Sequence, residues 1–133
     1  MNKDYFDDWE DKRFYSWLAG FWEGDGCFIN YYPPSAGRSL RNIPRVFVES
    51  KFQISQKTPD ILYSIKKRTN LGEVYKCNQP FPFYQWTIGS KKDIITLLNN
   101  LLPLLSFRKE MVEEGYKKII QHSPRLFGKF KEA

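Results

Sequence analysis

The order of helical and β-prone segments restricts the fold more than any other feature of this sequence. Apolar residues recur at helical spacing in four segments, and the expected helices are 13–24, 58–70, 91–102 and 107–121. Alternating or aromatic, β-branched segments lie between them, and the expected strands are 27–32, 44–55, 73–78 and 83–88. Strands that follow one another in pairs, with helices between the pairs, predict an α+β fold with an antiparallel sheet and helices on one face.

Residues 44–55 show the clearest strand pattern. One side of this segment reads Val46, Val48, Ser50, Phe52 and Ile54, and the other reads Arg45, Phe47, Glu49, Lys51 and Gln53. Such alternation predicts one face on the core and one polar face. Local start signals also place the helices, and the expected N-caps are Asp11, Thr58 before Pro59, and Ser90 with Asp93 in a capping box. Pro103 is expected to end the third helix.

The charge of the chain changes sign directly after residue 26. Residues 1–26 hold three Lys and Arg against seven Asp and Glu, a net −4, whereas the whole 133-residue chain carries +6. A basic surface of this kind permits a nucleic-acid or anionic-membrane partner. We expect one domain over residues 1–133, with segments 1–12 and 123–133 loosely ordered.

Several classes of protein are disfavoured by what the sequence contains. Two cysteines and one histidine argue against a disulfide framework, a zinc site and histidine-based catalysis. No apolar run reaches about 18 residues, so no membrane span is expected. The acidic N-terminal dozen residues lack the apolar region of a signal peptide, so we do not expect secretion.

The string LAGFWEGDG, residues 18–26, combines small residues with acids at the end of the first expected helix. Gly20 and Gly24 lie one turn apart, and each costs about 1 kcal/mol in a helix relative to alanine. Two small residues at this spacing let another backbone approach closely. Gly26 is expected to end the helix in a left-handed conformation. Asp25 then lies where the helix dipole is negative, a position that favours a bound cation such as Mg²⁺.

This string closely resembles the signature of the LAGLIDADG homing endonucleases. Leu18, Ala19, Gly20, Asp25 and Gly26 match it, with Glu23 as the first acid and Gly24 as the small residue. FQISQK at 52–57, the LG before the third strand and YQWTI at 84–88 extend the resemblance along nearly the whole chain. The resemblance implies an αββαββα fold whose curved, four-stranded antiparallel sheet lies in the DNA major groove.

The resemblance also implies roles for individual residues. Asp25 is the expected metal ligand and catalytic carboxylate, with the carbonyl of Gly24 beside it. Gln56 matches a polar residue that positions water near the metal. Arg108 matches the basic residue near the scissile phosphate, with Lys109 as the alternative one position on. Mg²⁺ is the expected cofactor, and Mn²⁺ or Ca²⁺ can substitute in binding.

A single motif in the chain implies a homodimer that cleaves both strands of a long, pseudo-palindromic double-stranded DNA site. The two motif helices are expected to pack across a two-fold axis that brings both Asp25 carboxylates together. The expected interface residues are Leu18, Gly20, Phe21, Glu23 and Gly24.

The polar faces of the strands are expected to read the DNA. Gln and Lys suit adenine and guanine edges, and Glu accepts from cytosine. In the third strand the alternation is ambiguous, and we favour the face that carries Tyr75. The expected DNA-binding residues are Ile29, Tyr31, Arg38, Arg41, Arg45, Phe47, Glu49, Lys51, Gln53, Tyr75, Gln85 and Thr87.

Two other functions fit parts of the sequence. A non-cleaving binder on the same scaffold, such as an intron RNA-splicing maturase or a repressor, would not need Asp25, Gln56 and Arg108 together. An RNA-binding module with stacking aromatics would use residues that mostly fall on expected core faces. The resemblance therefore favours an intron-homing nuclease, located in a chloroplast, a mitochondrion or the bacterial cytoplasm.

Overall fold

The computed structural model describes residues 5–31 and 49–123. Their elements are α1 (Asp11–Asp25), β1 (Gly26–Tyr31), β2 (Glu49–Gln56), α2 (Asp60–Thr69), β3 (Glu73–Cys77), β4 (Phe83–Ile88), α3 (Lys91–Leu101), a 3₁₀ turn η1 (Leu102–Leu104) and α4 (Lys109–Gln121). This is the predicted order, and the α+β class is confirmed. Three groups of predictions lie outside what the structure describes: the strand at 44–48, the tail from 124 on, and the side-chain contacts of Tyr31, Arg38, Arg41, Arg45 and Phe47.

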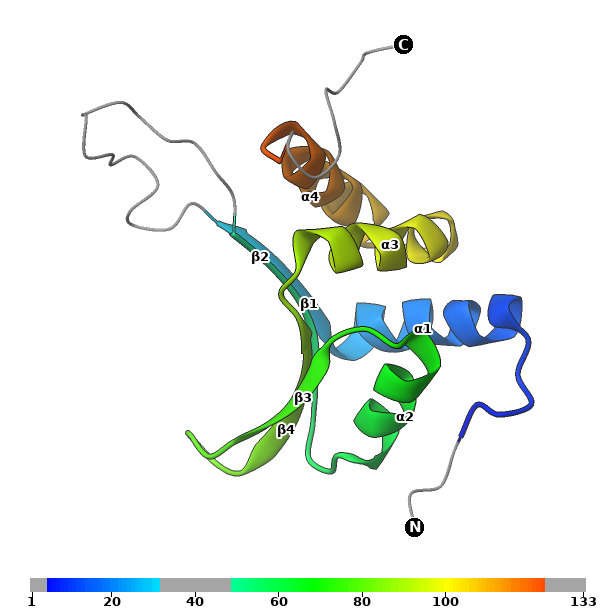
Figure 1. Ribbon diagram of the computed structural model, residues 1–133, viewed down its shortest axis with the longest axis vertical. Helices are drawn as coiled ribbons and strands as arrows, with labels where there is room; N and C mark the ends of the chain where they lie inside the picture. Colours follow the sequence, from blue (N-terminus) through cyan, green and yellow to red (C-terminus); the bar gives the residue numbers. More distant parts are fainter. Residues whose placement is uncertain (1–4, 32–48, 124–133) are drawn as a thin grey trace.

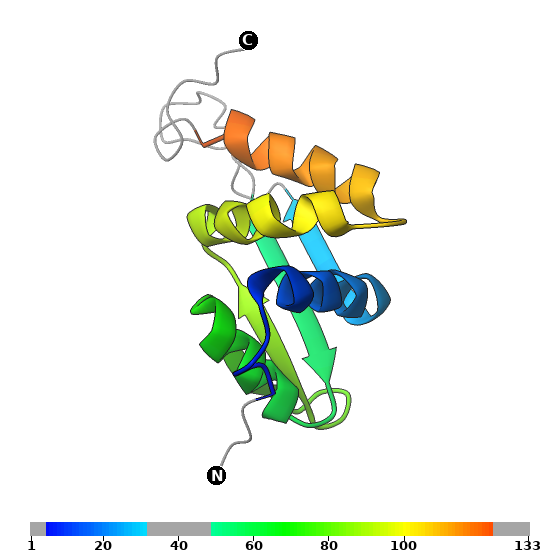
Figure 2. The same ribbon diagram turned by 90° about the vertical axis from the view of Figure 1, so that its right-hand side faces the viewer.

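The four strands form one antiparallel sheet in the order β1-β2-β4-β3. All four α-helices lie on one side of this sheet, and the opposite side is concave and free of helices (Figure 1). Seen from the helix side, α3 and α1 lie across the strands, with α4 beyond α3 and α2 beyond α1 (Figure 2). The fold therefore has two layers, with one sheet face covered and the other open.

The core lies between the helices and the covered sheet face. Leu18 and Trp22 of α1, Phe52 of β2 and Trp86 of β4 are all fully buried. The Trp22 and Phe52 rings stack with centroids 4.7 Å apart, and the Trp86 indole donates a hydrogen bond to the Leu71 carbonyl at 2.8 Å. Burial of these large side chains orients α1 firmly on the sheet, because each contributes about 2–3 kcal/mol on leaving water.

The helix ends agree only in part with the local sequence signals. Ser90 caps α3 as predicted, since its Oγ accepts the Asp93 N–H at 3.4 Å, and α3 ends just before the turn that contains Pro103. The predicted Thr58 cap is wrong, because Pro59 occupies the N-cap position of α2 without a side-chain cap hydrogen bond. The Asp11 cap is also wrong. Asp11 is the first residue of α1 itself.

The Asp11 carboxylate instead binds Arg68 of α2, and this contact helps to hold the N-terminal segment. Arg68 donates to Asp11 Oδ1 at 2.9 Å and to the carbonyls of Phe6 and Trp9, each at 2.6 Å. Phe6 is 2% exposed and packs on Phe14 with ring centroids 4.9 Å apart. Residues 5–10, expected to be loosely ordered, are thus packed against α1 and α2. Among the described helices, none is both long and apolar enough to span a membrane.

Candidate functional site

The C-terminal end of α1 brings two predicted site residues into contact. Asp25 is the last residue of α1 and is exposed, and its Oδ2 accepts a hydrogen bond from Gln56 Nε2 at 3.0 Å. Gln56 is the last residue of β2. The two meet because β1 begins directly after Asp25 and pairs Gly26 with Ile54 of β2. A carboxylate has two oxygens, so Oδ1 of Asp25 keeps its capacity to bind a cation.

Gly26 joins α1 directly to β1 without the left-handed turn that we predicted. Its backbone is extended, with φ −98° and ψ 169°. The reason for a glycine here is close packing, because a Cβ at this position would lie 1.9 Å from Cδ1 of the Trp22 ring. The buried indole therefore requires glycine, and Asp25 stays at the junction of helix and sheet.

Arg108 lies against the same end of α1. Its Nη1 donates to the Gly26 carbonyl at 2.7 Å and to the Trp22 carbonyl at 3.4 Å, and its guanidinium carbon lies 4.1 Å from the centroid of the Trp22 ring. A cation is favourable here because the helix dipole places negative charge at this terminus. Lys109, the first residue of α4, is exposed. The two candidates for the basic residue near the phosphate therefore differ in their surroundings. Arg108 contacts the end of α1, and Lys109 is exposed at the surface.

Glu23 also joins these two helices, because its side chain extends from α1 to the start of α4. Its side chain is buried, with 6% of the residue exposed. The carboxylate accepts the backbone N–H groups of Ser106, Phe107 and Arg108 at 2.8–3.0 Å. An acid at a helix N-terminus satisfies N–H groups that lack helical partners and is favoured by the dipole. We call Glu23 and Arg108, with these backbone partners, the α1–α4 clasp.

The clasp predicts a specific effect on stability. Glu23→Gln should lower the free energy of unfolding by about 2 kcal/mol, because one carboxylate oxygen that accepts N–H groups becomes a donor. Chemical denaturation of the purified protein measures this. The matched control is Glu114→Gln on α4, whose ion pair with Lys118 is exposed and 3.9 Å long, and whose loss should cost less than about 0.5 kcal/mol. If the two substitutions lower the free energy of unfolding equally, the α1–α4 clasp does not stabilise the fold as we infer.

The predicted interface residues differ in how much of each is exposed. Leu18 is fully buried and Glu23 nearly so, which leaves neither with area to offer a partner. Gly20 and Gly24 are exposed, and a Cβ at either would meet nothing within 4 Å. Phe21 is half-buried and stacks on Trp17 at 4.8 Å. Nothing in the described part of the protomer therefore requires glycine at positions 20 and 24.

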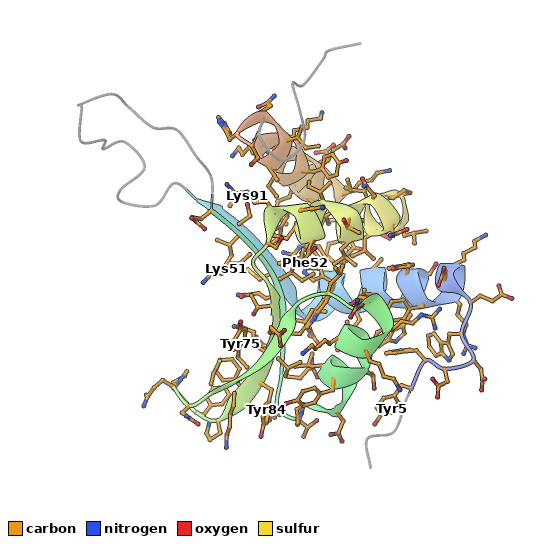
Figure 3. The ribbon with its side chains drawn as sticks, viewed as in Figure 1. Tyr5, Lys51, Phe52, Tyr75, Tyr84 and Lys91 are labelled. Atoms are coloured by element: carbon orange, nitrogen blue, oxygen red, sulfur yellow. The ribbon has the colours of Figure 1, made fainter. Side chains whose placement is uncertain are left out.

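The open face of the sheet carries the described members of the predicted DNA-binding set. Lys51 and Tyr75 extend from the sheet away from the helices, whereas Phe52 points toward them (Figure 3). The register places side chains of this face in rows across the strands. These rows are Ile29–Lys51, Cys27–Gln53–Thr87–Glu73 and Ser55–Gln85–Tyr75. For β3, the register therefore places Tyr75 on the open face, and that this face contacts DNA stays a prediction.

One polar side chain of this face is fixed by its neighbours. Gln85 Nε2 donates to Ser55 Oγ at 3.1 Å, and Gln85 Oε1 accepts from Thr87 Oγ1 at 3.4 Å. These two bonds set the direction of the amide. The group retains one N–H and one acceptor position, the pair that a glutamine presents to an adenine edge.

The donor set around Asp25 suits a hard divalent cation but is incomplete in one protomer. Within residues 5–31 and 49–123, no three His, Cys, Asp or Glu side chains gather to form a metal site. Asp25, held by Gln56, supplies carboxylate oxygen, the ligand type that Mg²⁺ and Ca²⁺ prefer.

Comparison with known proteins identifies the family of this chain. The family model described as LAGLIDADG endonuclease matches residues 18–121, which is most of the chain. The chain belongs to this family of DNA-cleaving nucleases. No curated protein sequence matches it at a significant level.

Solved structures of homing endonucleases share the fold. The homing endonuclease I-CvuI, in complex with the I-CreI target and Mg, has a TM-score of 0.68 at 24% identity, over 84% of this chain and 69% of that one. The archaeal intron-encoded I-Vdi141I, complexed with DNA, has a TM-score of 0.58 at 17% identity, over 93% of this chain and 88% of that one. I-SmaMI, bound to uncleaved DNA target with calcium ions, has a TM-score of 0.63 at 21% identity, over 84% of this chain and 38% of that one.

Proposed function

We propose that this protein is a site-specific, divalent-metal-dependent DNA endonuclease that acts as a homodimer. The observation that carries the proposal is the Asp25–Gln56 pair at the end of α1, beside two exposed glycines and an open sheet face. A binder without nuclease activity has no need for a carboxylate oriented in this way. The pair therefore favours cleavage over the maturase or repressor alternative.

In the proposed dimer, α1 of each copy packs along Gly20 and Gly24, with Phe21 at its side. Both positions are exposed and have open space around the missing Cβ, so a second backbone can approach closely. Two-fold symmetry would then bring the same surface of each copy together. The two Asp25 carboxylates lie at the ends of these helices, where they complete each other's donor set.

Each residue of the site has its own role in the proposed reaction. Asp25 and the Gly24 carbonyl would hold Mg²⁺, with Mn²⁺ or Ca²⁺ able to take its place in binding. When bound, the ion lowers the pKa of water and offsets charge on the phosphate. Gln56 fixes the carboxylate direction, and the Arg108 contacts fix the end of α1. Lys109, exposed at the start of α4, would attract the phosphate.

The open face would bind the major groove. Ile29, Lys51, Gln53, Gln85 and Thr87 occupy adjacent rows there, and donors and acceptors of this kind distinguish base edges. Glu49 and Tyr75 extend the same face. Two such faces around a two-fold axis predict a site with pseudo-palindromic halves.

A cleavage selection tests the proposed function. The purified protein is incubated with a library of DNA duplexes of randomised sequence and Mg²⁺, and the cut molecules are sequenced. We expect double-strand cleavage at one long site with related halves, and no cleavage when EDTA removes the ion. For an intron-homing enzyme, this site should match the joined sequences that flank its gene. Tight binding of duplex DNA without cleavage in Mg²⁺ or Mn²⁺ would instead support the non-cleaving alternative.

A further inference from the structure

The β3–β4 hairpin carries large aromatic side chains that the protomer leaves in solvent. Phe81, in the turn, is 56% exposed, and Tyr75 is 53% exposed. Phe83 is half-buried, and its ring centroid lies 5.9 Å from that of Phe81. Single exposed apolar residues are common, but a group of three at one end of a sheet indicates a binding surface. We call Tyr75, Phe81 and Phe83 the aromatic tip.

The aromatic tip continues the open face of the sheet. Tyr75 pairs with Gln85, and Phe83 pairs with Cys77 in the next row of the same parity. Side chains of the same parity lie on the same face, so Phe83 follows Thr87 and Gln85 along β4 on the side away from the helices. The hairpin itself bends toward this side (Figure 1). The proposed DNA-reading surface therefore changes from polar to aromatic as it approaches the turn.

The register also places the aromatic tip at the end of the sheet where Asp25 lies. Gln56, which contacts Asp25, pairs with Tyr84, the residue after Phe83. A DNA segment that crosses the open face beside the turn would thus be close to the bond that is cut.

We propose that the aromatic tip binds the 5-methyl groups of thymines in the major groove, near the cut positions of each half-site. This inference rests on the proposed function. Phenylalanine has no hydrogen-bonding group, so Phe81 and Phe83 cannot read the donors and acceptors of a base edge. Thymine is the base that presents an apolar group in the major groove, and apolar side chains recognise it by contact. The occupant that fits the tip is a thymine methyl group.

The test replaces thymine by deoxyuridine in the DNA site obtained by the cleavage selection, because this removes only the methyl group. Binding is measured in Ca²⁺ by fluorescence anisotropy. We expect the wild-type protein to lose about fourfold in affinity for each contacted methyl. Phe81→Ala combined with Phe83→Leu should bind the thymine site more weakly and lose most of its discrimination between thymine and deoxyuridine.

The matched control is Tyr63→Ala, because Tyr63 is an exposed aromatic of α2 with 42% exposure, on the helix side of the sheet. This variant should discriminate as the wild type does. Wild-type protein that binds thymine and deoxyuridine sites equally would overturn the proposal, whatever the variants do. If this protein still cuts the unmodified site, equal binding of the two sites overturns only the thymine contact and leaves the proposed nuclease function intact. If the protein neither binds nor cuts any duplex, both the thymine contact and the nuclease function are overturned.

Discussion

Asp25→Asn is expected to reduce DNA cleavage by about 10³-fold or more while DNA affinity is kept or increased. Asparagine loses the charge that holds a divalent cation, and with it the activation of water and the stabilisation of the transition state. Its Oδ1 can still accept the Gln56 hydrogen bond, so the end of α1 should keep its structure. Loss of an acid beside the phosphates also removes a repulsion. Single-turnover cleavage and binding of the selected site measure the two effects separately.

The matched control for this substitution is Glu113→Gln, which removes one negative charge from an exposed position of α4. It should cut the DNA at nearly the wild-type rate. An Asp25→Asn protein that cuts in Mg²⁺ as fast as this control would show that Asp25 is not a metal ligand.

Gly20→Leu is expected to prevent dimer formation and, with it, double-strand cleavage. The protomer itself has room for the new side chain, because a Cβ at position 20 meets nothing within 4 Å. A partner helix that packs against this position has no such room. Analytical ultracentrifugation should therefore show a dimer for the wild type and a monomer for the variant, and circular dichroism should show that both are folded.

A smaller substitution at the same position distinguishes a monomer from the proposed dimer. In a protomer whose α1 faces solvent, Gly20→Ala should stabilise the protein by about 1 kcal/mol, because alanine is the better helix former. In the proposed dimer, the same change should weaken association. The control Glu113→Leu places an apolar side chain on α4 and should leave the dimer intact. A Gly20→Ala protein that is more stable and equally dimeric would exclude α1 as the interface.

The sequence was sufficient to predict the order of the elements, because periodicity and turn residues are local properties. Its errors were also local: α2 begins one residue later than the Thr58-Pro59 signal indicated, and Gly26 is extended because it is already the first residue of β1. The parity of β3 could not be decided from its alternation. It followed only from the pairing of Tyr75 with Gln85.

The site was predictable to different degrees. The motif resemblance singled out Asp25 and Gln56 separately as site residues, and the structure places their side chains in contact. The α1–α4 clasp was missed, because Glu23 and its partners are 83–85 residues apart and no local pattern connects them. Phe81 was missed because a proline-rich turn indicates only a loop, and Phe83, the first residue of the expected strand 83–88, was not assigned to a face of the sheet.

The central claim is that two copies of Asp25 meet to hold divalent ions against the DNA. The most direct measurement is a crystal structure of the protein with its selected duplex in Ca²⁺. We predict Asp25 carboxylates from both copies within about 2.3–2.6 Å of bound ions, with the α1 helices packed along Gly20 and Gly24. Two Asp25 side chains that are far apart and without ions, on a DNA duplex otherwise fully bound, would contradict it.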